Sequence, residues 1–278
     1  VKENGSNNDV DVSKLSITGE GGSSYTLTSS DVEVSSSTQF TVTLNAADQL
    51  NVGGLLNKNG TSSDGGTTYN LAAADNWLAG AAASDDISDA SGNGITVSNV
   101  AKPTLSSTAY NAASGVLTVT GTNFVKENGS NNDVDVSKLS ITGEGGSSYS
   151  LTSSDVEVSS KTAFSVTLNA ADQLNVGGLL NKNGTSSDGG TTYNLAAADN
   201  WLAGAAASAD ISDASSNGIT VSNVANPTLS SAAYDAASGV LTVTGTNFVK
   251  ENGSNNDIDI SKLSITGEGG SSYTLTSS

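Results

Sequence analysis

The stretch GVLTVTGTNF, residues 115–124, decides how the rest of this chain is interpreted. Its alternation places Leu117 and Val119 on one face and threonines on the other, the pattern of a β-strand with one buried side. The same ten residues return at 239–248, and a shift of 124 positions aligns Val1–Phe124 with Val125–Phe248 at all but nine positions. A period of that length matches a whole domain. We therefore predict a tandem array of domains.

The domain boundaries are predicted from proline. The chain contains two prolines, Pro103 and Pro227, and each follows a short polar link. Because proline cannot donate a hydrogen bond within a sheet, it favours a linker or the first residue of an edge strand. The predicted units are 1–102, which lacks its first two strands, 103–226, which is complete, and 227–278, which holds first strands only. On this division the sequence is expected to be a window on a longer array.

The complete unit is predicted to be an all-β, immunoglobulin-like antiparallel sandwich of seven strands. Short alternating runs of Val, Leu, Ile and Thr, separated by Gly, Asn and Asp, give this pattern. The predicted strands are 104–110, 116–120, 134–142, 149–151, one through Val156 and Val158, 164–168, and one through Ile219 and Val221. The side chains predicted to lie inside are Leu117, Val119, Leu139, Ile141, Phe164, Val166, Leu168, Ile219 and Val221.

A small mixed insertion of helix and hairpin, residues 170–217, interrupts the strand pattern before the last strand. Asn169 is predicted to cap a short helix, and residues 179–193 to form a hairpin. Asn194 is predicted to cap a second helix that reaches Leu202 and buries Trp201. Seven alternating strands would place both this insertion and the polar loop 126–133 at the pole that faces the preceding unit.

The opening of each unit resembles a known family. Residues 115–124 fit the pattern G-x-L-x-V-x-G-x-x-F that is common in the second strand of IPT/TIG domains, and Pro-Thr-Leu stands before it at 103–105. These domains are immunoglobulin-like modules. The whole unit is also similar to the tandem repeats of large bacterial surface adhesins and biofilm proteins, so the resemblance implies an extracellular stalk. It covers residues 103–124 of the unit, and the insertion departs from a minimal domain of this family.

Composition excludes several kinds of function. The chain has no Cys or His, and all ten of its basic residues are Lys. It therefore has no disulfide, no thiolate or imidazole metal site and no Ser-His or Cys-His pair, and we expect no enzyme. The net charge of −18 argues against nucleic acid, because phosphate binding needs clustered Lys and Arg. No run of residues resembles a membrane span, so direct membrane insertion is not expected.

One acidic loop is a candidate calcium site. Calcium binds six to eight oxygens from carboxylates, amides and carbonyls, and this loop is rich in such groups. The candidate ligands are Glu127, Asn131, Asp133 and Asp135, with Asp9, Asp11, Asp257 and Asp259 in the other copies. The alternative is a solvated turn that leads into a strand. No other cofactor is predicted.

Three functions remain open. The first is the structural stalk of a secreted or surface-anchored bacterial adhesin or matrix protein, in which neighbouring repeats contact one another. The second is an extracellular filament whose subunits exchange strands with other copies in a fibre. The third is a carbohydrate-binding module that uses Trp77 and Trp201, although both are interpreted as core residues first. Because 249–278 repeats strands that 1–30 already contains, the sequence favours the continuous stalk over strand exchange.

Overall fold

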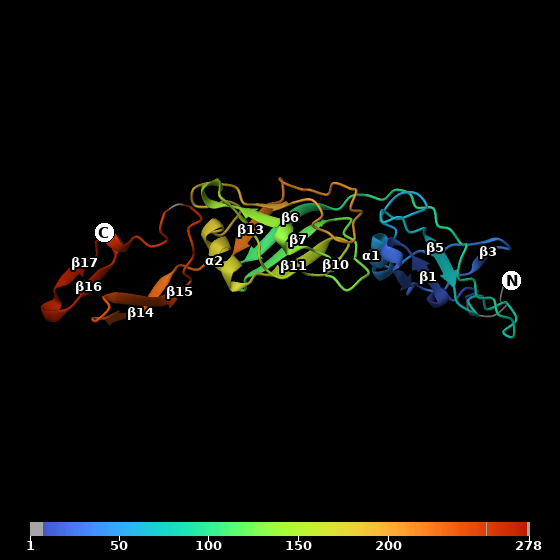
Figure 1. Cartoon of the computed structure of the whole chain (residues 1–278), viewed down its shortest axis with the longest axis horizontal. Coiled ribbons are helices and arrows are strands. Elements are labelled where there is room, and N and C mark those ends of the chain that lie inside the picture. The colour runs from blue at the N-terminus through green and yellow to red at the C-terminus, as the bar shows by residue number, and fades with distance from the viewer. Residues whose placement is uncertain (1–7, 254, 277–278) are drawn as a thin grey trace.

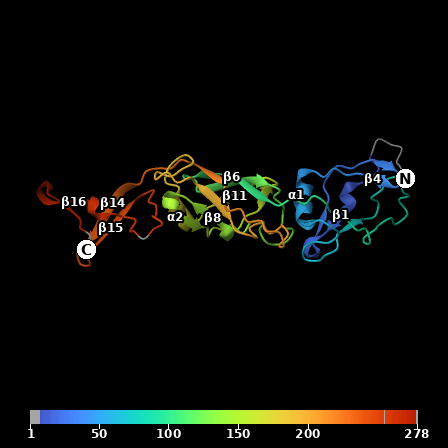
Figure 2. The same cartoon turned by 90° about the horizontal axis from the view of Figure 1, so that it is seen from above.

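The computed structural model describes residues 8–253 and 255–276. The chain forms three units in a row along its long axis (Figures 1 and 2): the first unit, 8–102, the second unit, 103–226, and the third unit, 227–276. The first unit contains β1 (Leu15–Thr18), β2 (Ser24–Thr26), β3 (Val34–Ser36), β4 (Gln39–Phe40), α1 (Ala46–Leu55) and β5 (Asn70–Ala73). The third unit contains two hairpins, each a separate sheet: β14 (Thr228–Asp235) with β15 (Val240–Thr246), and β16 (Ser264–Thr266) with β17 (Ser272–Thr274).

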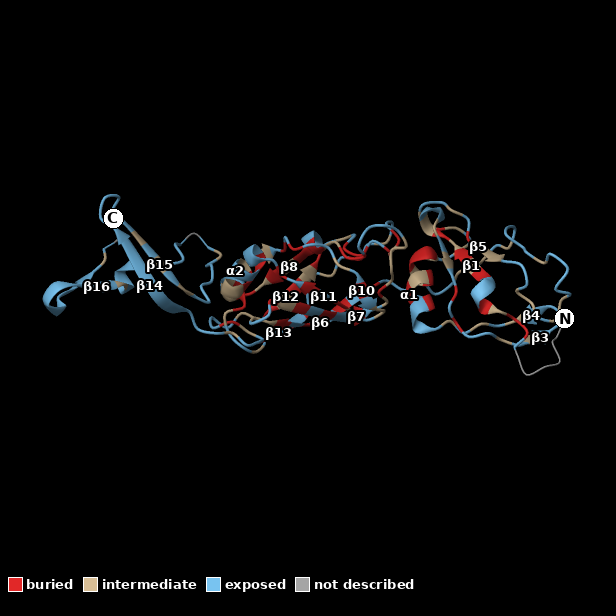
Figure 3. Ribbon diagram, turned by 90° about the horizontal axis from the view of Figure 1, so that it is seen from below, coloured by how far each residue is buried: buried red, intermediate tan, exposed pale blue. Residues whose placement is uncertain are grey.

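The second unit is built from one curved sheet of eight strands, in the order β10-β11-β7-β6-β13-β12-β8-β9. Its elements are β6 (Thr104–Asn111), β7 (Val116–Thr122), β8 (Leu139–Thr142), β9 (Ser148–Ser150), β10 (Val158–Ser160), β11 (Ala163–Thr167), α2 (Ala170–Leu179), β12 (Asn194–Ala197) and β13 (Gly218–Ser222). The two arms of the sheet share one core, because Leu117 and Phe164 from one arm cluster with Ile141 and Leu195 from the other. In Figure 3 many residues of these strands are coloured as buried.

The chain is therefore rich in β-structure, as predicted, but the details of the second unit differ. The prediction of seven antiparallel strands is wrong, since there are eight strands and β6 runs parallel to β13. The extra strand is β12, which occupies the place of the predicted second helix. Leu195 lies opposite Ile141 of β8, and this pairing overrides the mild helical preference of the alanines around it.

The predicted core is confirmed residue by residue. All nine side chains predicted to lie inside are at most 3% exposed. Each buried aliphatic side chain of this kind contributes about 1.5–3 kcal/mol before the entropy of ordering the chain is subtracted. Trp201 is fully buried as well, and its indole N–H donates to the carbonyl of Ile211 at 2.9 Å. Trp201 is thus a core residue and not a surface platform.

The insertion spans the whole length of the second unit. Asn169 caps α2 as predicted, with its side chain accepting from the backbone N–H of Asp172 at 2.8 Å. However, α2 lies at the end that faces the third unit, whereas residues 205–209 lie at the link to the first unit (Figure 1). The predicted placement at the preceding pole is therefore wrong for the helix. The pairing of β8 with β9 and of β10 with β11 makes β9 and β10 run in the same direction, so strand directions do not alternate there.

A second local difference follows from an aspartate. The predicted strand 134–142 is interrupted because the Asp135 side chain accepts from the backbone N–H of Ser137 at 3.0 Å and caps a short 3-10 turn, Val136–Lys138. β8 therefore begins only at Leu139. In the described part of the chain, no helix is long and apolar enough to cross a membrane.

Candidate functional site at the joint between units

The joint between the first and second units is made by the helix of one and the entry loop of the next. The backbone N–H of Lys126 donates to the carbonyl of Leu50, in α1, at 3.1 Å. The side-chain amide of Asn128 donates to the carbonyl of Asn51 at 2.8 Å. Lys161 adds a longer contact from its ammonium to the Gln49 side chain at 3.4 Å. We call these three contacts together the first joint.

Two adjacent glycines of α1 let the backbones approach each other at the first joint. A Cβ atom on Gly54 would lie 1.8 Å from the carbonyl oxygen of Lys126, and one on Gly53 would lie 2.7 Å from the Val125 side chain. Glycine weakens a helix interior relative to alanine by about 0.5–1 kcal/mol. The contact with the next unit supplies a physical reason for glycine at both positions.

The second joint, between the second and third units, repeats the backbone, amide and glycine contacts of the first. The N–H of Lys250 donates to the carbonyl of Leu174 at 3.0 Å, and the amide of Asn252 donates to the carbonyl of Asn175 at 2.8 Å. A Cβ atom on Gly178 would lie 1.8 Å from the Lys250 carbonyl oxygen, the same distance as at the first joint. Each repeat of the sequence therefore specifies the same contact with the unit that follows it.

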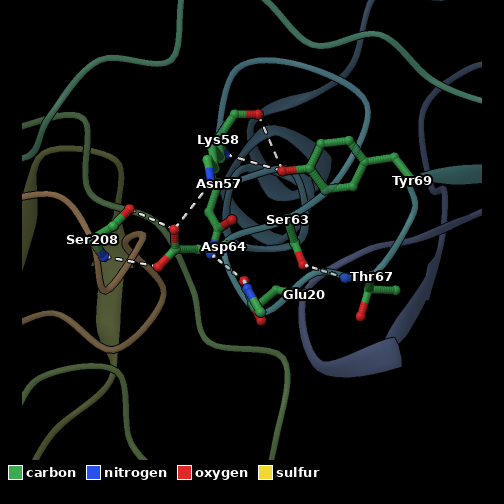
Figure 4. Close-up of polar contacts among 9 residues, drawn as sticks. Glu20, Asn57, Lys58, Ser63, Asp64, Thr67, Tyr69 and Ser208 are labelled. Atoms are coloured by element: carbon green, nitrogen blue, oxygen red, sulfur yellow. Dashed lines mark hydrogen bonds and ion pairs between the residues drawn. The ribbon is translucent and has the colours of Figure 1, made fainter.

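Two further hydrogen bonds connect the first and second units beside the first joint (Figure 4). Asp64, in a loop of the first unit, accepts from both the backbone N–H of Ser208, at 2.8 Å, and its hydroxyl. These bonds from Ser208 lower the pKa of Asp64. The counterpart of Asp64 in the second unit, Asp188, has a side chain that is 84% exposed, against 15% for Asp64.

Three of the nine differences between the copies lie at the first joint. At each of them the second copy or the link is more positive than its counterpart: Lys161 against Ser37, Ala209 against Asp85, and Lys102 against Asn226. The Lys102 ammonium donates to the carbonyl of Asp210 at 2.9 Å. In a chain with a net charge of −18, these changes reduce repulsion between the acidic units.

The acidic loop lies at the joint, as its place after β7 predicts, but its carboxylates bond to the protein's own N–H groups. Asp133 is completely buried, and its two oxygens accept from the N–H of Glu127 at 2.6 Å and of Val158 at 2.8 Å. Burial raises the pKa of Asp133 to about 6, and the neighbouring carboxylate of Glu157 adds to this rise. Lys126 forms an ion pair with Glu157 at 2.6 Å.

The other candidate calcium ligands have separate local roles. The copies of Asp133 act alike, since Asp9 accepts from the N–H of Val34 at 2.9 Å and Asp257 from the N–H of Glu251 at 2.7 Å. Asp11, Asp135 and Asp259 each cap a 3-10 turn. Glu127 accepts from the N–H of Gly129, and Asn131 is exposed. Within residues 8–253 and 255–276, no three acidic side chains gather as a metal site requires.

Calcium binding stays a prediction, and a thermal melt checks it. A site with a dissociation constant near 1 mM, filled at 10 mM calcium, would add about 1.4 kcal/mol to the free energy of unfolding. The melting temperature should then rise with calcium and fall back with chelator. The double variant Asp133→Ala with Asp135→Ala should lose that response. Identical melting in calcium and in chelator would contradict the prediction.

A carboxylate whose structural role the sequence analysis did not identify lies at the start of each α-helix. Asp172 is fully buried and accepts from the hydroxyls and N–H groups of Thr152 and Ser153 and from the hydroxyl of Tyr149. Burial would raise the pKa of Asp172, but these hydrogen bonds outweigh it and hold the pKa below its ordinary value. Asp48 has the same bonds in the first unit. The one local signal is an acid three residues after the Asn cap.

No family model, no curated protein and no solved structure matches this chain.

Proposed function

We propose that this chain is a section of a stiff, tandem-repeat stalk of a secreted or surface-anchored bacterial protein, built from immunoglobulin-like units of the IPT/TIG kind. Its role is to hold whatever lies at its ends at a fixed distance and direction. The partners that the function requires are the neighbouring repeats of the same chain.

The observation that carries the proposal is the repeated joint. A flexible linker would leave neighbouring units free to adopt different arrangements, whereas here two successive joints have the same hydrogen bonds and the same glycine contacts. The same joint, applied at each repeat, extends units along one line, as the row in Figures 1 and 2 illustrates. Acidic units also repel one another along the rod, which favours extension.

The substitution Gly54→Ala is expected to loosen the first joint without unfolding the first unit. The new methyl group would collide with the Lys126 carbonyl oxygen, while alanine favours the helix itself by about 0.5–1 kcal/mol. Because the chain has no cysteine, spin labels can be placed at Ser91→Cys and Ser215→Cys, one period apart. Electron spin resonance should give a narrow distance distribution in the parent chain and a broad one with Gly54→Ala.

The control is Gly94→Ala, a glycine whose added Cβ would meet nothing within 4 Å. It should leave the distance distribution narrow. An equally narrow distribution with Gly54→Ala, or a broad one in the parent chain, would contradict a stiff stalk.

A further inference from the structure

The loop that enters the first joint carries an Asn-Gly pair, Asn128-Gly129. The side-chain amide of Asn128 donates to the carbonyl of Asn51 at 2.8 Å and to that of Lys126 at 3.2 Å. In an Asn-Gly pair the glycine nitrogen can attack the side-chain amide of the asparagine, because glycine has no side chain to crowd the approach. One of the hydrogen bonds of the joint is therefore made by a chemically labile group.

A carboxylate contacts the nitrogen that would make this attack. The backbone N–H of Gly129 donates to Oε2 of Glu127 at 2.9 Å. A Cβ atom on Gly129 would lie 2.4 Å from Oε1 of the same carboxylate, so any larger residue would displace it. A carboxylate within hydrogen-bond distance of a proton that must be removed has the geometry of a general base. Three successive residues thus supply the base, the labile amide and the nucleophile.

Two other Asn-Gly pairs of the chain provide an internal comparison. The N–H groups of Gly60 and Gly184 each donate to a backbone carbonyl at 2.9 Å, and a carbonyl does not take up a proton at neutral pH. The asparagines of these pairs, Asn59 and Asn183, are exposed, whereas Asn128 is partly buried. Solvent exposure alone therefore predicts that Asn128 reacts last of the three. The position of the carboxylate predicts that it reacts first.

We propose that Asn128 is a self-modification site, at which the chain loses ammonia and loosens the first joint. The nitrogen of Gly129 attacks Cγ of Asn128, and the proton of that nitrogen passes to the carboxylate of Glu127. Glu127 returns the proton to the amide nitrogen, which leaves as ammonia, and a succinimide ring remains. Water then opens the ring and leaves a carboxylate at position 128, as aspartate or isoaspartate. Water is the only co-reactant, and no electrons are transferred.

The product cannot restore the hydrogen bonds of the joint. A carboxylate has no N–H group to donate to the carbonyls of Asn51 and Lys126, and its negative charge would face their oxygens. In the closed joint, the two bonds of Asn128 restrict rotation of its side chain. The reaction is therefore expected to be faster whenever the joint opens. A temporary opening would become permanent in this way.

The second joint contains the same arrangement. The side-chain amide of Asn252 donates to the carbonyl of Asn175 at 2.8 Å and to that of Lys250 at 3.3 Å. A Cβ atom on Gly253 would lie 2.3 Å from Oε1 of Glu251. The site thus belongs to the repeat and is not a peculiarity of one copy.

Peptide mapping by mass spectrometry measures the reaction directly. After incubation of the 278-residue chain at neutral pH, the mass increase that marks an amide replaced by a carboxylate should appear at Asn128 before Asn59 and Asn183. Glu127→Gln keeps an oxygen that can accept from Gly129 but takes up no proton. It should slow the loss at Asn128 by at least about tenfold, because a positioned general base typically contributes more than that. Earlier loss at Asn59 and Asn183, or an unchanged rate with Glu127→Gln, would overturn the proposal.

The link between the reaction and the joint has its own test. Gly54→Ala, which is expected to loosen the first joint, should speed the loss of the amide at Asn128 and leave the rate at Asn183 unchanged. Gly94→Ala, the control at an open position, should alter neither rate. A rate at Asn128 that does not rise with Gly54→Ala would show that the joint does not restrain the reaction, and would overturn this link.

Spin labels at Ser91→Cys and Ser215→Cys measure the effect of the product on the joint. Asn128→Asp should broaden the distance distribution. Asn59→Asp is the matched control, because the Asn59 side-chain oxygen accepts from the N–H of Val100 at 2.9 Å and aspartate keeps that acceptor. The control should stay narrow, and either a narrow distribution with Asn128→Asp or a broad one with both variants would overturn the proposal. The loosening rests on the proposed stiff stalk, whereas the loss of ammonia is measured by mass alone, so the two can fail separately.

Discussion

Asp172→Asn is expected to lower the free energy of unfolding of the second unit by about 3–5 kcal/mol. The carboxylate of Asp172 accepts hydrogen bonds from Tyr149, Thr152 and Ser153 and has no donor of its own. An amide keeps the shape but turns an NH₂ group toward some of these donors. Buried donors then lose their acceptors, and the start of α2 separates from the loop after β9.

Tryptophan fluorescence can assign this loss to one unit. The chain has two tryptophans, one in the first unit and one in the second, so Trp77→Phe leaves Trp201 as the reporter of the second unit. In that background Asp172→Asn should shift the urea midpoint strongly, whereas Asp48→Asn, the same change one period earlier, should not. Equal, small shifts from both variants would show that the carboxylate is dispensable.

The second large effect is on pH dependence, and it comes from Asp133. The pKa of this buried carboxyl is raised to about 6 in the folded chain, against about 3.9 in an unfolded one. The folded state therefore binds this proton more tightly. Its contribution to stability is fully present below about pH 4 and is lost as the pH rises through 6, a difference of about 3 kcal/mol.

Urea unfolding between pH 4 and pH 7, again followed by Trp201, measures this slope. Asp133→Asn cannot titrate and should flatten the slope, whatever it does to the absolute stability. Asp135→Asn, an acid two residues away that caps an exposed turn, should leave the slope in place. Glu157 contacts Asp133 and pairs with Lys126. Glu157→Gln should therefore lower the pKa of Asp133 and narrow the pH range over which the free energy of unfolding changes. An unchanged slope with Asp133→Asn would contradict the claim that the raised pKa of Asp133 causes this pH dependence.

What the sequence predicted well was local. The inward faces of the strands, such as Leu117 with Val119, follow from an alternation within a few residues. The Asn169 cap follows from one side chain and the helix beside it. What it predicted poorly depends on distant partners. β12 is a strand because Leu195 meets Ile141, and this distant pairing overrides the helical preference of the neighbouring alanines.

The joint could be predicted only in part. The loop after β7 was expected at the preceding pole, and Lys126 does bond there. The pair Gly53-Gly54 in a helix was a visible signal, but what it contacts is a backbone more than seventy positions away. The acids of the loop were interpreted as ligands for an ion because their number was visible and their N–H partners were not. Asp133 accepts from the N–H of Val158, which begins β10 and is distant in the sequence.

The parallel pair β6 and β13 has a mechanical consequence. These are the first and last strands of the second unit, and they lie side by side over 107–111 and 218–222. Tension applied through the two ends of the unit pulls the start of β6 one way and the end of β13 the other. The strands are then loaded in shear, so their hydrogen bonds bear the force together instead of opening one at a time. We expect a pulled unit of this topology to resist until the strand pair slides as a whole.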